Sequence, residues 1–69
     1  MARVDWRERV VINPEIHHGE PCIRGTRIPV KVIVSSLAEG MSFEDILREY
    51  PPLSAEDLWA ALAYSQRRI

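Results

Sequence analysis

Two arginines, Arg24 and Arg27, stand on either side of a Gly-Thr pair, and their guanidinium groups offer the clearest chemistry in the sequence. A guanidinium binds a carboxylate or a phosphate through two parallel hydrogen bonds. Two of them at the tip of a turn would therefore suit an acidic protein surface or a nucleic acid. A structural role stays open beside this one, because an arginine packed over the acidic helices would neutralise Glu39 or Glu49.

The second set of reactive side chains is His17, His18 and Cys22, which fall within six residues. Imidazole and thiolate both ligate zinc, and an imidazole can serve a thiol as its base. The sequence holds no second pair of ligands, however, and a catalytic cysteine needs a base that a third group orients. We therefore expect two loop histidines and a buried cysteine, with no metal, no cofactor and no catalytic residue.

The glycines and prolines around the two arginines predict a tight hairpin. Two of the three glycines and two of the five prolines fall between positions 19 and 30. Gly25 can adopt the positive φ that a tight reversal requires. A reversal there would pair Cys22-Ile23 with Arg27-Ile28 and would place the guanidinium groups at the tip.

A short strand is expected before the hairpin, at Arg9-Val10-Val11-Ile12, because β-branched residues suit a half-buried pleated surface. Asn13-Pro14 ends it, since proline cannot donate to a ladder. The strand should lie beside the hairpin in a sheet of two or three strands. Residues 1–8 alternate charges without an apolar period, so we expect an N-terminal arm there, in which Trp6 is large enough to cover an interface.

Everything after the hairpin is predicted to be helical. Pro29 fixes φ near the helical value and opens a first helix, which ends at Gly40. Ser42 with Asp45 predicts the capping box of a second helix, which Pro51-Pro52 stops. Apolar residues recur at the helical spacing i, i+3, i+4 and i+7 in both segments: Val30, Ile33, Val34, Leu37 and Ala38 in the first, Phe43, Ile46, Leu47 and Tyr50 in the second.

A third helix is predicted from about residue 55 to residue 67, after a second capping signature at Ser54 and Asp57. Its apolar residues form two groups, Leu58, Ala61 and Leu62 on one face and Trp59, Ala63 and Tyr64 spreading onto another. One face can pack on the domain, and the other needs a different partner. Because so short a chain buries only about 60% of its unfolded surface, we expect a homodimer with Trp59 at its interface.

Charge is distributed unevenly behind the net value of −1: residues 1–31 sum to +2, residues 32–66 to −5, and the last two arginines add +2. Such an uneven charge distribution bears on which partners the protein binds rather than on its fold. The residues that we assign to partner binding are the exposed basic groups and one aromatic: Arg24, Arg27, Trp59, Arg67 and Arg68.

DNA binding is expected to be weak at most. A recognition helix would meet the phosphates with the two acids at its start, Glu56 and Asp57, whereas affinity for DNA depends on neutralising phosphates. The residues that we assign to such binding therefore precede the acidic segment: Arg24, Arg27 and Lys31.

The composition, 46% apolar and 28% charged over 69 residues, is typical of one globular domain, which we place at residues 9–67. A single cysteine favours a reducing compartment. No apolar run follows Met1, and none reaches membrane-spanning length. A cytoplasmic protein without membrane contact is therefore expected.

The hairpin and its flanks carry a resemblance to a known family. The residues that carry it are Gly19-x-Pro21-x-Ile23-Arg24-Gly25-Thr26-Arg27-Ile28-Pro29, preceded by Ile12-Asn13-Pro14-Glu15-Ile16 and followed by Gly40-Met41-Ser42-x-x-Asp45-Ile46-Leu47 and Tyr50-Pro51-x-Leu53. Over residues 9–65 the chain resembles domain of unknown function family 433 (DUF433), a family of small prokaryotic proteins. The resemblance implies a helix-turn-helix-like fold and the role of an antitoxin beside a PIN-like ribonuclease toxin.

We therefore predict a mostly helical α+β protein, a helix-turn-helix-like trihelical domain with an N-terminal strand and β-hairpin. We expect a non-catalytic interaction protein, and the resemblance implies the antitoxin of a type II toxin–antitoxin pair. Two alternatives stay open, a DNA-binding transcriptional regulator and a self-associating structural module without a toxin partner.

Overall fold

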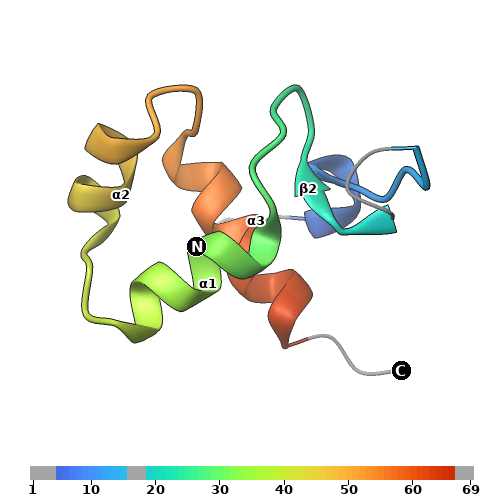
Figure 1. Cartoon of the computed structure of the whole chain (residues 1–69). Coiled ribbons are helices and arrows are strands. Elements are labelled where there is room, and N and C mark those ends of the chain that lie inside the picture. Colours follow the sequence, from blue (N-terminus) through green and yellow to red (C-terminus); the bar gives the residue numbers. More distant parts are fainter. Residues whose placement is uncertain (1–4, 16–18, 67–69) are drawn as a thin grey trace.

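Three α-helices, a two-stranded antiparallel sheet and a short 3-10 helix make up the residues that the computed structural model describes, 5–15 and 19–66 (Figure 1). This is the mostly helical α+β architecture that the sequence predicts. The elements in chain order are η1 Trp6–Glu8, β1 Val10–Val11, β2 Cys22–Ile23, α1 Val30–Ala38, α2 Phe43–Glu49 and α3 Ala55–Ser65.

The two predicted capping boxes are confirmed at the starts of α2 and α3. The Ser42 hydroxyl accepts a hydrogen bond from the Asp45 amide at 3.1 Å, and the Ser42 amide donates to the Asp45 carboxylate at 3.3 Å. Ser54 and Asp57 repeat both bonds at 3.4 and 2.9 Å. Each box satisfies two amides that have no partner inside the helix, so the sequence alone locates where these helices begin.

The first helix begins one residue later than predicted. Pro29 has a ψ of 144° and is the extended N-cap, so α1 starts at Val30. Proline fixes φ alone, and an extended ψ is compatible with that φ. At the other end Gly40 has a φ of +100°, which is the left-handed residue expected there.

The predicted reversal at Gly25 is confirmed, with a φ of +80°. The Thr26 amide donates to the Ile23 carbonyl at 3.0 Å, and the Ile23 amide donates to the Ile28 carbonyl at 3.1 Å. Residues 27–28 do not form a regular strand, however: this bond and one from the Val30 amide to the Pro21 carbonyl, at 2.9 Å, make a single isolated bridge between Cys22 and Pro29. Pro29 has no N–H to continue the ladder.

The regular partner of β2 is β1, which pairs with it antiparallel in the register Val10 with Ile23 and Val11 with Cys22. The strand spans two residues rather than the four predicted. A further bond from the Arg24 amide to the Arg9 carbonyl, 2.7 Å long, extends the contact to the start of the turn. The sheet therefore fixes the turn against the N-terminal part of the chain.

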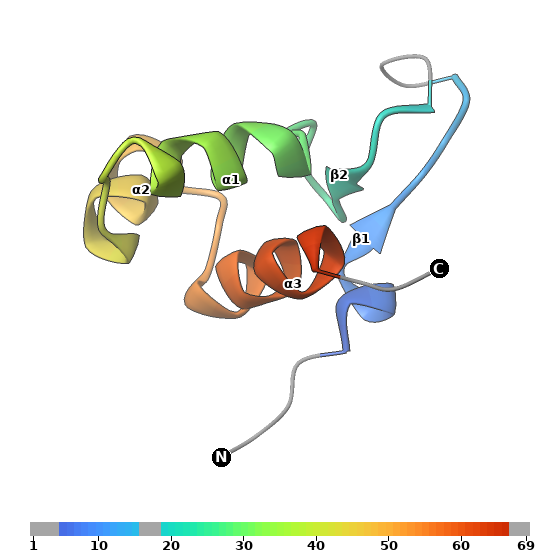
Figure 2. The same cartoon turned by 90° about the horizontal axis from the view of Figure 1, so that it is seen from below.

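The hydrophobic core lies between α1 and α3. Figure 2 shows these two helices side by side, with the sheet at one end and α2 at the other. Buried residues from every regular element except η1 form this core: Val10, Ile23, Val30, Ile33, Ile46, Leu53, Leu58, Ala60, Ala61 and Tyr64. No helix within residues 5–15 and 19–66 is long and apolar enough to cross a membrane.

The N-terminal segment packs against α3 instead of forming a free arm over its described residues. Trp6 meets Tyr64 edge to face, with ring centroids 4.9 Å apart and ring planes at 82°. This contact explains one difference from the sequence prediction: Tyr64 lies in the core, whereas Leu62 is only half-buried. The packed part of the chain thus extends before residue 9, to η1.

Candidate partner-binding surfaces

The first candidate surface is the basic turn, which we define as residues 24–27. Arg24 and Arg27 are both exposed there. The turn is held by its own threonine: the Thr26 hydroxyl donates to the Ile23 carbonyl at 2.9 Å and accepts from the Ile28 amide at 3.1 Å. Two guanidinium groups are therefore presented on a short loop whose backbone has little freedom, which lowers the entropy cost of binding.

Arg24 is oriented by the N-terminal segment. Its Nε donates to the backbone carbonyl of Glu8 at 2.9 Å. Arg24 therefore bonds to a backbone carbonyl, and not to the Glu39 or Glu49 carboxylate that the alternative structural role offered. The bond uses Nε alone. Among the described residues, the two terminal amino groups of this guanidinium are not engaged, so they can donate to an acceptor on a binding partner.

Arg9, which sequence reasoning missed, pairs with two acidic residues at the start of α3. Its Nη1 lies 3.0 Å from the Asp57 carboxylate, and its Nη2 lies 3.2 Å from the Glu56 carboxylate. The Asp57 side chain is 11% exposed. Its carboxylate accepts from the Ser54 amide, which caps α3, and also pairs with Arg9. The N-terminal strand is thereby joined to the start of α3.

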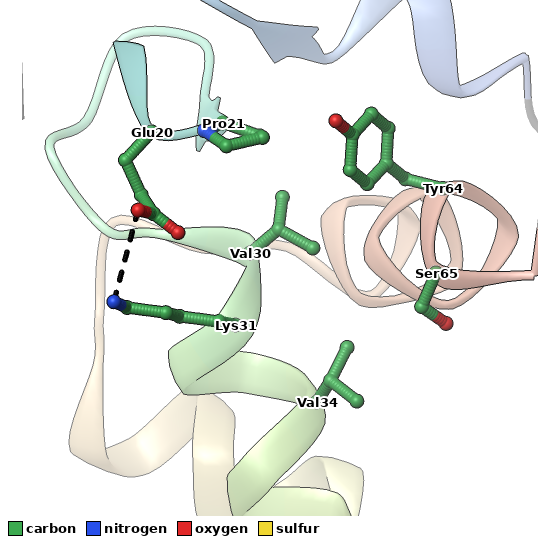
Figure 3. A pocket seen from close by; sticks show the side chains of 7 residues that line it. All are labelled: Glu20, Pro21, Val30, Lys31, Val34, Tyr64 and Ser65. Atoms are coloured by element: carbon green, nitrogen blue, oxygen red, sulfur yellow. Dashed lines mark ion pairs between the residues drawn. The ribbon is translucent and has the colours of Figure 1, made fainter. Parts of the chain in front are cut away.

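Lys31 lies on the side of α1 that faces the Glu20-Pro21 loop. Its Nζ is 3.7 Å from the Glu20 carboxylate, at the edge of an open groove of about 220 Å³ (Figure 3). The remaining lining is mainly apolar and comes from the loop, α1 and the end of α3: Pro21, Val30, Val34, Tyr64 and Ser65. The ammonium group is thus paired at this groove.

The second candidate surface is aromatic. The Trp59 residue is 53% exposed, and its ring meets Phe43 of α2 with centroids 5.0 Å apart and planes at 66°. Phe43 is itself partly buried against the core. One part of the indole is therefore anchored while the rest faces solvent, as predicted for a residue on the second face of the helix.

Some of the predicted residues fall outside the described part of the chain. Arg67 and Arg68 lie beyond residue 66, and His17 and His18 lie between residues 15 and 19. Within the described residues, no three side chains of histidine, cysteine, aspartate or glutamate form a group that could hold a metal ion. The assignments of these four residues stay predictions.

Cys22 is buried, as predicted, and its thiol donates to the Glu20 carbonyl at 3.3 Å. Burial, and secondly the negative charge of Glu20, raise the pKa of this thiol above its ordinary value of 9.0. The unfolded chain ionises its thiol first as the pH rises. The stability that the neutral thiol contributes is therefore complete below pH 9 and is lost as the pH rises through the folded-state pKa.

We expect iodoacetamide to alkylate Cys22 at least roughly tenfold more slowly in the folded protein than in guanidinium chloride at the same mildly alkaline pH, because only the exposed thiolate reacts. Mass spectrometry of timed samples measures both rates. Equal rates in the two solutions would contradict the burial of this thiol.

Comparison with known proteins gives consistent matches along most of the chain. The family model described as "Protein of unknown function (DUF433)" matches residues 10–65. A relative from Sinorhizobium fredii (strain NBRC 101917 / NGR234), the uncharacterized protein y4eO, is 42% identical over 60 residues, which cover 87% of this chain and 27% of that protein.

A solved structure shares the fold. It is the 2.00 Å crystal structure of a DUF433 member from Anabaena variabilis ATCC 29413, which matches with a TM-score of 0.80 and 40% identity. The match covers 84% of this chain and 57% of the other. The chain therefore spans about a quarter of the first relative and a little over half of the second.

Proposed function

The chain belongs to the DUF433 family, and on that premise we propose that it is a non-catalytic protein-binding module that acts as an antitoxin and neutralises a PIN-like ribonuclease. The single observation that carries the proposal is the basic turn, where Arg24 and Arg27 are exposed on a loop fixed by internal hydrogen bonds. The family resemblance supplies the kind of partner, and the turn supplies the means of binding it.

The chemistry of the turn suits an acidic catalytic site. A metal-dependent nuclease holds its cations with carboxylates, and a guanidinium forms paired, charge-assisted hydrogen bonds to the same groups. In the proposed complex Arg24 and Arg27 engage those carboxylates. The Glu8 carbonyl, which already holds the Nε of Arg24, keeps that guanidinium oriented and reduces the rotamer entropy that binding would otherwise cost.

The test is an RNA-cleavage assay with a purified PIN-like ribonuclease as the proposed partner. Purified wild-type protein is expected to suppress its RNA cleavage, and the double variant Arg24→Ala/Arg27→Ala is expected to raise the inhibition constant at least roughly tenfold, because charge-assisted bonds contribute about 1.5–3 kcal/mol each before solvent screening. Lys31→Ala is the matched control. It removes one exposed cation outside the turn and should leave inhibition unchanged.

Two results would overturn the proposal: no effect of wild-type protein on the nuclease, or equal inhibition by the double variant.

A second candidate, DNA binding, is favoured by one observation. Arg9 partly compensates the acids at the start of α3. The DNA-binding transcriptional regulator would be favoured if the protein bound promoter DNA tightly and with a steep salt dependence, and if substitution of exposed α3 residues abolished that binding.

A further inference from the structure

We infer that the outward face of α3 is the contact surface for a second copy of this chain. This inference does not rest on the proposed function, because it concerns a different element from the basic turn. We define the outward face as Ala55, Trp59, Leu62 and Ala63, all of which are exposed or half-buried.

The first argument is the double apolar pattern of α3. Its buried side is formed by five residues that face the domain: Asp57, Leu58, Ala60, Ala61 and Tyr64. The outward residues recur at i, i+4, i+7 and i+8, which is the spacing of an apolar stripe that normally faces a core. A helix that is apolar on both sides is typical of a buried helix, yet Trp59 at the centre of the outward face is 53% exposed.

The second argument concerns charge. The only charged residues of α3 are Glu56 and Asp57. Asp57 is buried on the domain side, and Glu56 is held by Arg9 at 3.2 Å. The four residues of the outward face are uncharged, and the exposed Glu56 carboxylate at its edge is paired with Arg9, so two copies can approach through this face although residues 32–66 sum to −5.

The third argument fixes the arrangement. In an antiparallel pair about a two-fold axis, the indole of Trp59 can lie over the small side chain of Ala63 in the other copy, and each contact is made twice. The same register places Glu56 of one copy opposite Gln66 of the other, so the two Glu56 carboxylates lie about 15 Å apart along the helices at a rise of about 1.5 Å per residue. A parallel pair would bring these carboxylates together, which like-charge repulsion disfavours.

The size of the outward face indicates how strongly two copies associate through it. An eleven-residue helix is about 16 Å long and about 10 Å wide. With Phe43 beside it, such a face buries on the order of a few hundred Å² per copy, below the roughly 800 Å² per partner of a standard stable interface. The expected dimer is therefore a weak, transient one.

Sedimentation equilibrium over a series of concentrations tests the inference. Wild-type protein should pass from 7.9 kDa towards twice that mass as the concentration rises through the micromolar range. Trp59→Ala should raise the Kd at least roughly tenfold, as central aromatic residues do. Ala63→Lys should do the same while leaving the contact between Trp59 and Phe43 in place, so a loss of folding in the first variant does not decide the outcome.

Ile12→Ala is the matched control, because Ile12 is also an exposed large apolar residue, at 56%, but lies after β1 rather than on α3. Its Kd should equal that of the wild type. A wild-type protein that stays monomeric at every concentration would overturn the inference. So would unchanged dimerisation of both α3 variants.

Discussion

Replacing Asp57 by alanine is expected to lower the free energy of unfolding by about 2–3 kcal/mol. The substitution removes the capping acceptor for the Ser54 amide, a loss of about 1 kcal/mol, and the partner of Arg9 at 3.0 Å. Because the Arg9 side chain is 35% exposed, solvent screens that ion pair, and we assign it about 1–2 kcal/mol rather than the value of a fully buried pair.

Chemical denaturation of two variants separates the two contributions. Asp45→Ala removes the same capping box from α2, and there the carboxylate has only a neighbouring exposed arginine, Arg48 at 3.7 Å. It should cost about 1 kcal/mol. Equal losses from Asp57→Ala and Asp45→Ala would mean that the contact with Arg9 contributes nothing to stability.

Replacing Gly25 by valine is expected to lower the free energy of unfolding by about 2 kcal/mol, which corresponds to a thermal midpoint lower by roughly 8–16 °C. A φ of +80° is unfavourable for a β-branched residue. An added Cβ would meet no atom within 4 Å, so the loss comes from the backbone and not from a clash.

Gly25→Asn is the control for this prediction, since asparagine tolerates the left-handed region better than valine does and occupies the same open space. Circular dichroism melts should rank the midpoints as glycine, then asparagine, then valine. A valine variant within a degree or two of the parent would show that the turn relaxes to another conformation at little cost.

The parts of the fold that the sequence predicts correctly depend on interactions within a few residues. The hydroxyls of Ser42 and Ser54 accept from backbone amides three residues on, and Gly25 and Gly40 mark reversals by a conformation that glycine favours. These signals are complete in the local sequence. Helix starts and turns could therefore be placed to within a residue.

The contacts that the sequence did not reveal join distant segments. Arg9 and Asp57 are 48 residues apart, and Trp6 reaches Tyr64 only because β1 pairs with β2 and places η1 beside α3. Neither residue type nor spacing singles out these pairs, since several acids would suit Arg9 equally well. The same holds for the candidate surfaces: the basic turn follows from local signals, whereas the environment of Arg24 and the outward face of α3 depend on tertiary packing.

The central proposal is that the basic turn binds a nuclease and that the outward face of α3 binds a second copy. The most direct measurement is the mass of the complex by light scattering over a series of concentrations, with the proposed PIN-like nuclease and this protein mixed in equal amounts. We expect wild-type protein to reach a complex of two copies of each. Trp59→Ala should reach that mass only at concentrations at least roughly tenfold higher, and Arg24→Ala/Arg27→Ala should need at least roughly tenfold more protein to bind the nuclease. Loss of the nuclease in Trp59→Ala, or binding of the nuclease by the double arginine variant at the same concentrations as by wild-type protein, would contradict the account.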